Sequence, residues 1–102
     1  MECYLVYVTA SSESEAATIG QTAVQERLAA CANIFGQTTS IFWWENKLQT
    51  DLESVLILKT ARHSLDALLK CLKEIHSYEC PCILAVKVSH GNKEFFDFIE
   101  DV

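Results

Sequence analysis

The stretch CANIFGQTTSIFWWENKLQTDLESVLILKT, residues 31–60, decides the fold. Both of its halves are rich in β-branched and aromatic residues, which favour strands, and they flank the tripeptide Glu45-Asn46-Lys47. Asparagine tolerates the left-handed backbone conformation that a tight turn needs. Gly36 interrupts the first half and predicts a bulge. The stretch therefore predicts one long β-hairpin.

The predicted hairpin is longer than a compact chain of this size can cover. Its second strand, residues 48–60, spans roughly 43 Å at about 3.3 Å for each residue. A compact chain of 102 residues has a diameter of roughly 34 Å. The hairpin tip, with Phe42, Trp43 and Trp44, is therefore expected to project and to need a partner.

The elements on either side of the hairpin follow from hydrophobic periodicity. The pattern predicts strands over residues 3–9 and 83–89, and amphipathic helices over 13–29, 65–75 and, after Gly91-Asn92, 95–102. The order β-α-β-β-α-β plus a terminal helix predicts an α+β fold: a ferredoxin-like βαββαβ sandwich with a long central hairpin and a short C-terminal helix. One domain is expected over residues 1–102.

The strands predict that a second molecule covers the sheet. A sheet with helices on one face and water on the other should alternate apolar and polar residues. The segments Val55-Leu56-Ile57-Leu58, Leu5-Val6-Tyr7-Val8 and Ile83-Leu84-Ala85-Val86 are apolar on both faces. In a cyclic homo-oligomer whose hairpins add to neighbouring sheets, other copies would cover the open sheet face and pair with the long hairpin.

Composition excludes several classes of partner. The net charge is −6, and the eight Lys and Arg residues are scattered, so neither nucleic acid nor an anionic membrane surface is an expected partner. The N-terminal segment does not resemble a signal peptide, and no apolar run is long enough to span a bilayer. We therefore expect a cytoplasmic protein in which the five cysteines are reduced.

Four segments, in order and spacing, resemble the CutA (divalent-cation tolerance) family: AACANI at 29–34, SIFWWENK at 40–47, LILKT at 56–60 and HSYECPC at 76–82. The resemblance covers nearly the whole chain. It implies a ferredoxin-like protomer in a tight homotrimer, as in PII-type signalling proteins, and a function in tolerance of divalent metals. Some members of the family bind copper, and no agreed catalytic reaction accompanies the fold, so the chain is not expected to be an enzyme.

The chain departs from the family pattern at several positions. Copper binding in some bacterial members is attributed to a cysteine and two adjacent histidines, which correspond here to Val8, Ile75 and His76, so that site does not carry over whole. The other departures are Ser77 for a proline, Cys82 for a glutamate, Asn46 for a turn glycine and Phe98 for a tryptophan.

His76, Cys80 and Cys82 are the candidate metal ligands. Imidazole and thiolate suit copper(I) or zinc, and three ligands predict a weakly held ion with a fourth position open. The alternative is structural. His76 would then lie against the negative end of the preceding helix, and the two cysteines would pack beside Pro81.

A second set of residues from the matched segments is the candidate ligand-binding set: Lys59, Tyr78, Glu53, Trp44 and Arg27. They form either a cleft between protomers, where Lys59 accepts an anion and Tyr78 donates a hydrogen bond, or a network of intersubunit salt bridges and packing contacts. Trp43 and Trp44 are expected to be interface anchors. His63 and His90 lie near predicted loops and are expected to be solvated.

Three functions follow from these candidates. The first is a trimeric, cytoplasmic metal-tolerance protein that binds a divalent metal or a small ligand between protomers. The second is a PII-like sensor of a small anionic metabolite that signals to a partner protein. The third is an enzyme using Lys59, Tyr78 and His76, although the chain contains no nucleophile motif. No organic cofactor is expected, since no phosphate-binding glycine loop is present.

Overall fold

The computed structural model describes residues 2–102, which form four strands and three helices. In chain order these are β1 (Cys3–Ala10), α1 (Glu13–Gln25), β2 (Cys31–Trp44), β3 (Lys47–Ala61), α2 (Arg62–Ile75), β4 (Ile83–Val88) and α3 (Lys93–Asp101). The predicted ferredoxin-like α+β fold is confirmed. None of the helices in the described part of the chain is long and apolar enough to cross a membrane.

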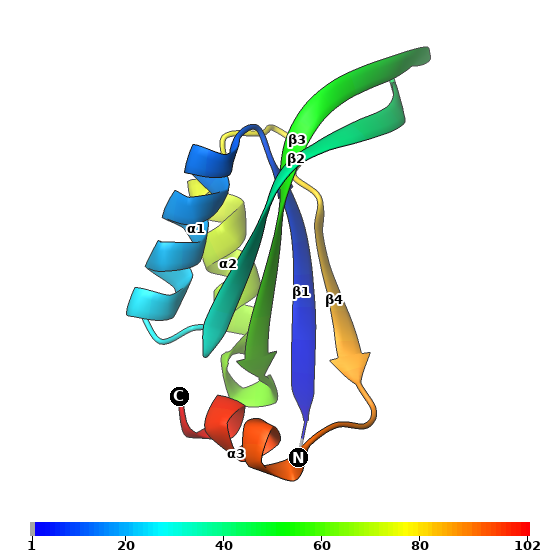
Figure 1. Ribbon diagram of the computed structural model, residues 1–102. Helices are drawn as coiled ribbons and strands as arrows, with labels where there is room; N and C mark the ends of the chain where they lie inside the picture. The colour runs from blue at the N-terminus through cyan, green and yellow to red at the C-terminus, as the bar shows by residue number, and fades with distance from the viewer. Residues whose placement is uncertain (1) are drawn as a thin grey trace.

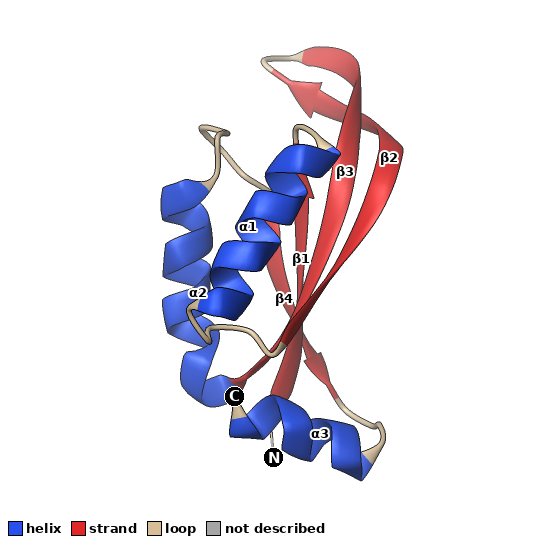
Figure 2. Ribbon diagram, turned by 60° about the vertical axis from the view of Figure 1, so that its left-hand side comes forward, coloured by secondary structure: helices blue, strands red, loops and turns tan. Residues whose placement is uncertain are grey.

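The strands form one antiparallel sheet in the order β2-β3-β1-β4. Helices α1 and α2 lie side by side on one face of this sheet, and α3 lies across the end at which β4 stops (Figures 1 and 2). The core fills the space between the sheet and the first two helices. Its largest fully buried apolar side chains are Val6, Val8, Ile19, Leu56, Leu58, Leu68 and Leu72.

Helix α1 begins as predicted but ends earlier. The Ser12 side chain caps it by accepting the Glu15 N–H at 3.0 Å. At its other end, Arg27 takes a left-handed φ of 59° and the Leu28 N–H returns to the Ala23 carbonyl. This closure stops the helix at Gln25 rather than at residue 29, and the usual glycine signal for such an ending is missing from the sequence.

Helix α1 and the sheet approach each other closely at Gly20. A Cβ atom there would lie 3.2 Å from both the Ala32 Cβ and a methyl group of Leu56. The absence of a side chain at Gly20 thus allows the helix to lie directly on β2 and β3.

Helix α2 begins directly after β3, at Arg62. His63 was expected near a loop and solvated, and its side chain is exposed. His63 belongs to the first turn of α2, and its Nε2 atom lies 3.1 Å from the Glu100 carbonyl oxygen of α3. The early helix start had no local sign, since the capping position is Ala61, which offers no side-chain hydrogen bond.

The hairpin has the predicted turn and bulge. Glu45 and Asn46 both have positive φ, at 50° and 63°, which suits a two-residue hairpin turn. The β2–β3 register shifts between Phe35 and Gln37, at Gly36. Beyond the bulge the hairpin bends away and extends past the helices (Figure 1). The molecule is accordingly elongated, with dimensions of 44 × 25 × 23 Å.

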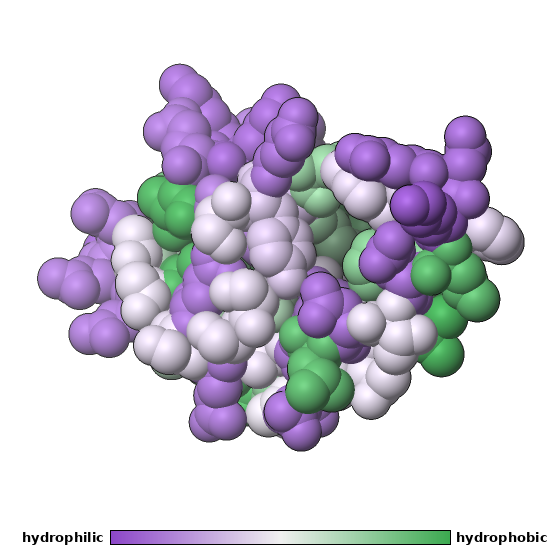
Figure 3. Space-filling model, turned by 90° about the horizontal axis from the view of Figure 1, so that it is seen from above, coloured by the Kyte–Doolittle hydropathy of each residue, from purple (hydrophilic) through white to green (hydrophobic). Residues whose placement is uncertain are grey.

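The sheet face opposite the helices carries exposed apolar side chains. Leu5 and Tyr7 of β1 lie beside Val86 and Leu84 of β4 on this face, and Leu84 is 60% exposed. A second apolar surface lies on the projecting hairpin, on the side that faces away from the open sheet face, where Ile41, Trp43, Leu48 and Leu52 are all more than half exposed. Hydrophobic side chains accordingly stand at the surface among hydrophilic ones in the view from above (Figure 3). The expectation that a partner covers the open sheet face stays a prediction.

Candidate functional site

A cleft of about 770 Å³ lies where the hairpin bends over the end of β1 and the loop that joins α2 to β4. It is lined by Tyr7 and Thr9 of β1, Ser40, Phe42 and Trp44 of β2, Gln49, Asp51 and Glu53 of β3, and Ser77, Tyr78, Glu79, Cys80 and Cys82 of the loop.

Strand alternation explains which hairpin residues reach the cleft. Ser40, Phe42 and Trp44 are two residues apart and share one side of β2, while Asp51 and Glu53 share the same side of β3, with Ser40 directly opposite Asp51. The hairpin therefore presents two aromatic rings and two carboxylates to one side.

The other side of the hairpin carries four exposed apolar side chains, together with Thr39 and Thr50. Trp43 and Leu48 are paired across the strands, and Ile41 and Leu52 lie on the same side. Trp43 is 72% exposed, compared with 46% for Trp44. The two tryptophans, treated together in the sequence, thus have different surroundings: Trp44 belongs to the cleft and Trp43 to the outer side of the hairpin.

Tyr78 connects the loop to the hairpin. Its hydroxyl donates a hydrogen bond of 2.8 Å to Glu53 Oε2. Burial, together with this hydrogen bond and the charge of Glu53, raises the pKa of the Tyr78 hydroxyl far above its usual value. The phenol therefore stays protonated and keeps donating to Glu53, which fixes the carboxylate at the wall of the cleft.

His76 connects the start of the loop to β1. Its buried ring lies 4.6 Å from the Tyr78 ring, centroid to centroid. Nδ1 lies 3.0 Å from the Tyr78 backbone N–H, which can only donate, and Nε2 lies 2.7 Å from the Thr9 carbonyl oxygen, which can only accept. These partners assign the neutral tautomer with the proton on Nε2.

Glu15 ties the same loop to the start of α1. Its carboxylate accepts hydrogen bonds from the Ser11 N–H and hydroxyl and from the Ser77 N–H, at 2.8–3.0 Å. Burial acts to raise the pKa of Glu15, but the hydrogen bonds from Ser77 and Ser11 together outweigh it and lower the pKa from 4.5 to about 2. The first residues of the loop are therefore held by hydrogen bonds on three sides: His76 to β1, Ser77 to α1 and Tyr78 to β3.

The lining of the cleft is acidic. Asp51, Glu53 and Glu79 contribute three carboxylates, and no Lys or Arg is among its lining residues within the described part of the chain. Such a wall attracts cations and repels anions.

The structure brings most of the predicted site residues together. Trp44, Glu53, Tyr78, Cys80 and Cys82 all line the cleft, and His76 lies directly behind Tyr78. The lining residues that were not predicted as site residues are Tyr7, Thr9, Ser40, Phe42, Gln49, Asp51, Ser77 and Glu79. Two-residue steps along the strands from Trp44 and Glu53 lead to Phe42 and Asp51, so the strand period could have found those two.

Two predicted residues lie elsewhere. Arg27 is exposed just past the end of α1. Lys59 lies on the open sheet face beside Leu5, with its Nζ atom 5.4 Å from the centre of the Phe95 ring of α3. Lys59, Tyr78 and His76 therefore do not converge on one point of the protomer.

The three expected metal ligands do not form a ligand cluster in one chain. Among residues 2–102 no group of three His, Cys, Asp or Glu side chains is arranged to hold a metal ion. Both ring nitrogens of His76 already have backbone partners, which leaves no nitrogen lone pair facing the cleft. Cys80 and Cys82 are free thiols and line the cleft.

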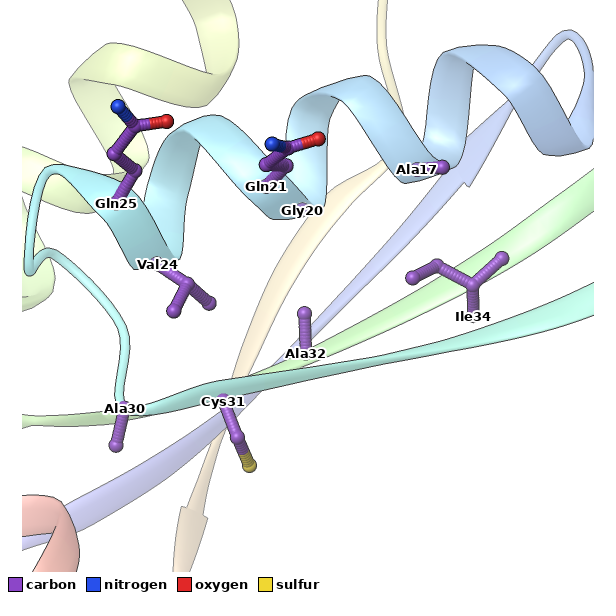
Figure 4. A pocket seen from close by; sticks show the side chains of 9 residues that line it. All are labelled: Ala17, Gly20, Gln21, Val24, Gln25, Ala30, Cys31, Ala32 and Ile34. Atoms are coloured by element: carbon purple, nitrogen blue, oxygen red, sulfur yellow. The ribbon is translucent and has the colours of Figure 1, made fainter.

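A second hollow, of about 500 Å³, lies between α1 and β2 (Figure 4). Ala32 and Ile34 point from β2 toward the helix, and Val24 points from α1 toward the strand, whereas Cys31 points away on the opposite side of β2. No charged side chain lines this hollow. It offers little chemistry beyond apolar contact.

Fold and cleft together define a ferredoxin-like α+β protein with an extended hairpin and an acidic, aromatic cleft at the base of that hairpin. Residues 4–102 match the model of the CutA1 divalent ion tolerance protein family, and the chain belongs to that family. The names of this family and its members describe tolerance proteins rather than enzymes.

Individual relatives agree over almost the whole chain. A divalent-cation tolerance protein CutA of Archaeoglobus fulgidus is 40% identical over 94% of this chain and 93% of its own length. A solved structure from the same organism, described as the periplasmic divalent cation tolerance protein CutA, gives a TM-score of 0.92 at 39% identity and covers 99% and 97% of the two chains. The chloroplastic protein CutA 1 of rice (Oryza sativa subsp. japonica) is 36% identical over 95% of this chain, which spans 55% of the rice protein's length.

We predict that Glu15→Gln destabilises the protein in a pH-dependent way. Because the folded-state pKa of about 2 lies below the usual 4.5, the Glu15 carboxylate stabilises the fold above pH 4.5, and this contribution is lost as the pH falls toward 2. Thermal unfolding should give a lower Tm for the variant at pH 7 and equal values near pH 2. Glu13→Gln, in the same helical turn, is the control. A Tm difference that stays constant with pH would contradict this account.

We predict that His76→Leu destabilises the protein. The change leaves the Tyr78 N–H and the Thr9 carbonyl without their partners, and an unsatisfied buried polar group costs about 1–3 kcal/mol. Urea unfolding should show the loss. In the control, His90→Leu, the ring is exposed and contacts the Ser89 hydroxyl, so little change is expected. Equal losses in the two variants would show that His76 does not hold the loop.

Proposed function

We propose that this protein acts in divalent-cation tolerance as a homotrimer whose acidic cleft binds cations. One observation carries the cation-binding part of the proposal: three carboxylates line the cleft, and no base lines it in the described residues. Membership of the CutA1 family supports the physiological role. The exposed apolar surfaces and the family resemblance support the trimer.

Self-association is supported by two separate apolar surfaces. The open sheet face carries Leu5, Tyr7, Leu84 and Val86, and the outer side of the hairpin carries Trp43 with its apolar neighbours. The two surfaces lie on opposite sides of the strands, so a head-to-tail contact between copies, which can close into a ring, fits them better than a symmetric dimer. β2 and β4 are both edge strands and can pair with another copy.

A PII-like sensor of a small anion was the main alternative. The acidic lining of the cleft disfavours it, because the basic residues that would neutralise an anion, Lys59 and Arg27, lie outside the cleft of the same protomer. An enzyme based on Lys59, Tyr78 and His76 is disfavoured by their separation and by the tautomer in which His76 is held.

The ligand types in the cleft suggest two kinds of metal. Carboxylate oxygens of Asp51, Glu53 and Glu79 suit hard divalent cations, and the thiols of Cys80 and Cys82 suit copper(I) or zinc. With fewer than three ligands assembled by one chain, binding is expected to be weak unless another copy or water completes the coordination.

A cytoplasmic location remains part of the proposal. All five cysteines are free thiols, which is typical of a reducing compartment. Fractionation of cells that produce the protein tests this directly, and recovery in a periplasmic or organellar fraction would contradict it.

We predict that Trp43→Ala dissociates the assembly and that Trp44→Ala does not. Removing a buried aromatic anchor commonly costs about 2 kcal/mol or more of binding energy. In sedimentation velocity the unchanged protein and Trp44→Ala should have three times the chain mass of 11.5 kDa, and Trp43→Ala should be smaller or aggregated. A monomeric unchanged protein would contradict the trimer, and dissociation by Trp44→Ala alone would reverse the roles of the two tryptophans.

We predict weak binding of zinc that depends on the cleft. Asp51→Asn removes one cleft carboxylate without breaking the Tyr78–Glu53 hydrogen bond, and should weaken zinc binding by about tenfold, which is roughly 1.4 kcal/mol. Asp97→Asn, on α3, is the matched control. Calorimetric titration of reduced protein measures both variants.

The thiols have their own test. In a copper(I) titration against a competing chelator, the double variant Cys80→Ser, Cys82→Ser should bind more weakly than Cys71→Ser, in which the changed cysteine belongs to α2. Equal binding by all proteins in both titrations would place any metal outside the cleft.

A further inference from the structure

We propose that the cleft binds an aliphatic diammonium cation, a short methylene chain with a protonated amine at each end. This rests on the proposed function in one respect, that the cleft attracts cations, and it names an organic class of ligand for the same site. The feature that carries it is the combination of ring faces and carboxylates around one cavity of about 770 Å³, a size typical of small-molecule sites.

The aromatic side chains are the part of the wall that a metal ion does not use. Tyr7, Phe42, Trp44 and Tyr78 come from β1, the hairpin and the α2–β4 loop, and all four line the cleft. Aromatic rings provide no ligand for zinc or magnesium, but their faces attract ammonium groups and their surfaces pack against methylenes. Phe42 and Trp44 are 38% and 46% exposed in the single chain, so their surfaces are accessible there.

The carboxylates fit the two charged ends. Asp51 and Glu53 are two residues apart on the same side of β3, which places their Cα atoms about 6.6 Å apart. An extended four-carbon chain separates two terminal nitrogens by a similar distance, roughly 6 Å, from ordinary bond lengths. Each ammonium can therefore meet its own carboxylate.

Glu53 is held in place for this contact. One of its oxygens accepts the Tyr78 hydroxyl at 2.8 Å, and its other oxygen can accept a hydrogen bond from an ammonium group. The raised pKa of Tyr78 keeps that hydroxyl protonated, so Tyr78 does not add a fourth negative charge to the cleft. The third carboxylate, Glu79, adds to the local negative potential.

The described residues lack a competing all-protein metal site. No set of three His, Cys, Asp or Glu side chains in residues 2–102 is arranged around one point. A diammonium ion needs no such convergence, because it uses separated carboxylates and the apolar surface between them. The cleft's chemistry therefore suits the organic cation better than a bare metal ion.

Calorimetric titration of the assembled protein with putrescine, butylamine and zinc tests the proposal. Putrescine, which carries two ammonium groups, should bind about tenfold more tightly than butylamine, which carries one. Trp44→Leu keeps an apolar side chain without an aromatic face and should weaken putrescine binding by about tenfold, while Trp44→Phe should restore most of it. Asp51→Asn should reduce the putrescine affinity to that of butylamine.

The outcomes separate this inference from the proposed function. Zinc binding without putrescine binding would overturn the inference and leave the cation-binding role intact. Binding of neither would overturn both. Putrescine binding that is unchanged in Trp44→Leu and Asp51→Asn would show that the amine binds elsewhere. Equal affinities for putrescine and butylamine would contradict the claim that each ammonium group contacts its own carboxylate.

Discussion

The long antiparallel pairing of β2 with β3 is the interaction on which the rest of the structure depends. Its fourteen and fifteen residues continue well past the helices. The part of the hairpin that packs against α1 and α2 contributes to the core, and the part beyond the bulge at Gly36 extends past the helices (Figure 1). Since each strand residue alternates sides, this projecting part has one side that faces the cleft and another that faces away.

This alternation gives the two tryptophans different surroundings. Trp44 stands with Phe42 and the carboxylates of β3 in the cleft, and Trp43 stands with Leu48 on the apolar outer side. A single hairpin can thus contribute to a binding site and to an interface between copies. The opposite wall of the cleft depends on His76, Glu15 and Tyr78, which fasten the α2–β4 loop to β1, α1 and β3.

Local sequence signals predicted the fold well. The turn at Asn46, the bulge at Gly36 and the order of the elements all follow from residue type and period. The end of α1 did not, because the closing residue is Arg27 in a left-handed conformation that usually favours glycine.

The site was predicted only in part, for a physical reason. His76 meets Thr9, which is 67 residues away in the chain, and Tyr78 meets Glu53, 25 residues away. No local pattern encodes such contacts. Both ring nitrogens of His76, an expected metal ligand, contact the backbone within one chain. Lys59 was expected in a cleft between protomers, which stays a prediction; within its own protomer it lies away from the acidic cleft, on the same sheet face. The sequence motifs therefore identify the segments that form the site, whereas tertiary packing determines which of their side chains are in contact.

The central claim, that other copies cover the outer side of the hairpin, is tested most directly by acrylamide quenching of Trp43 fluorescence in the Trp44→Phe protein. Trp43 is 72% exposed in a single chain. The account predicts that Trp43 is shielded from acrylamide at concentrations where the protein is assembled, and becomes accessible when dilution dissociates it. A Trp43 that is fully accessible in a protein of unchanged mass at every concentration would contradict the account.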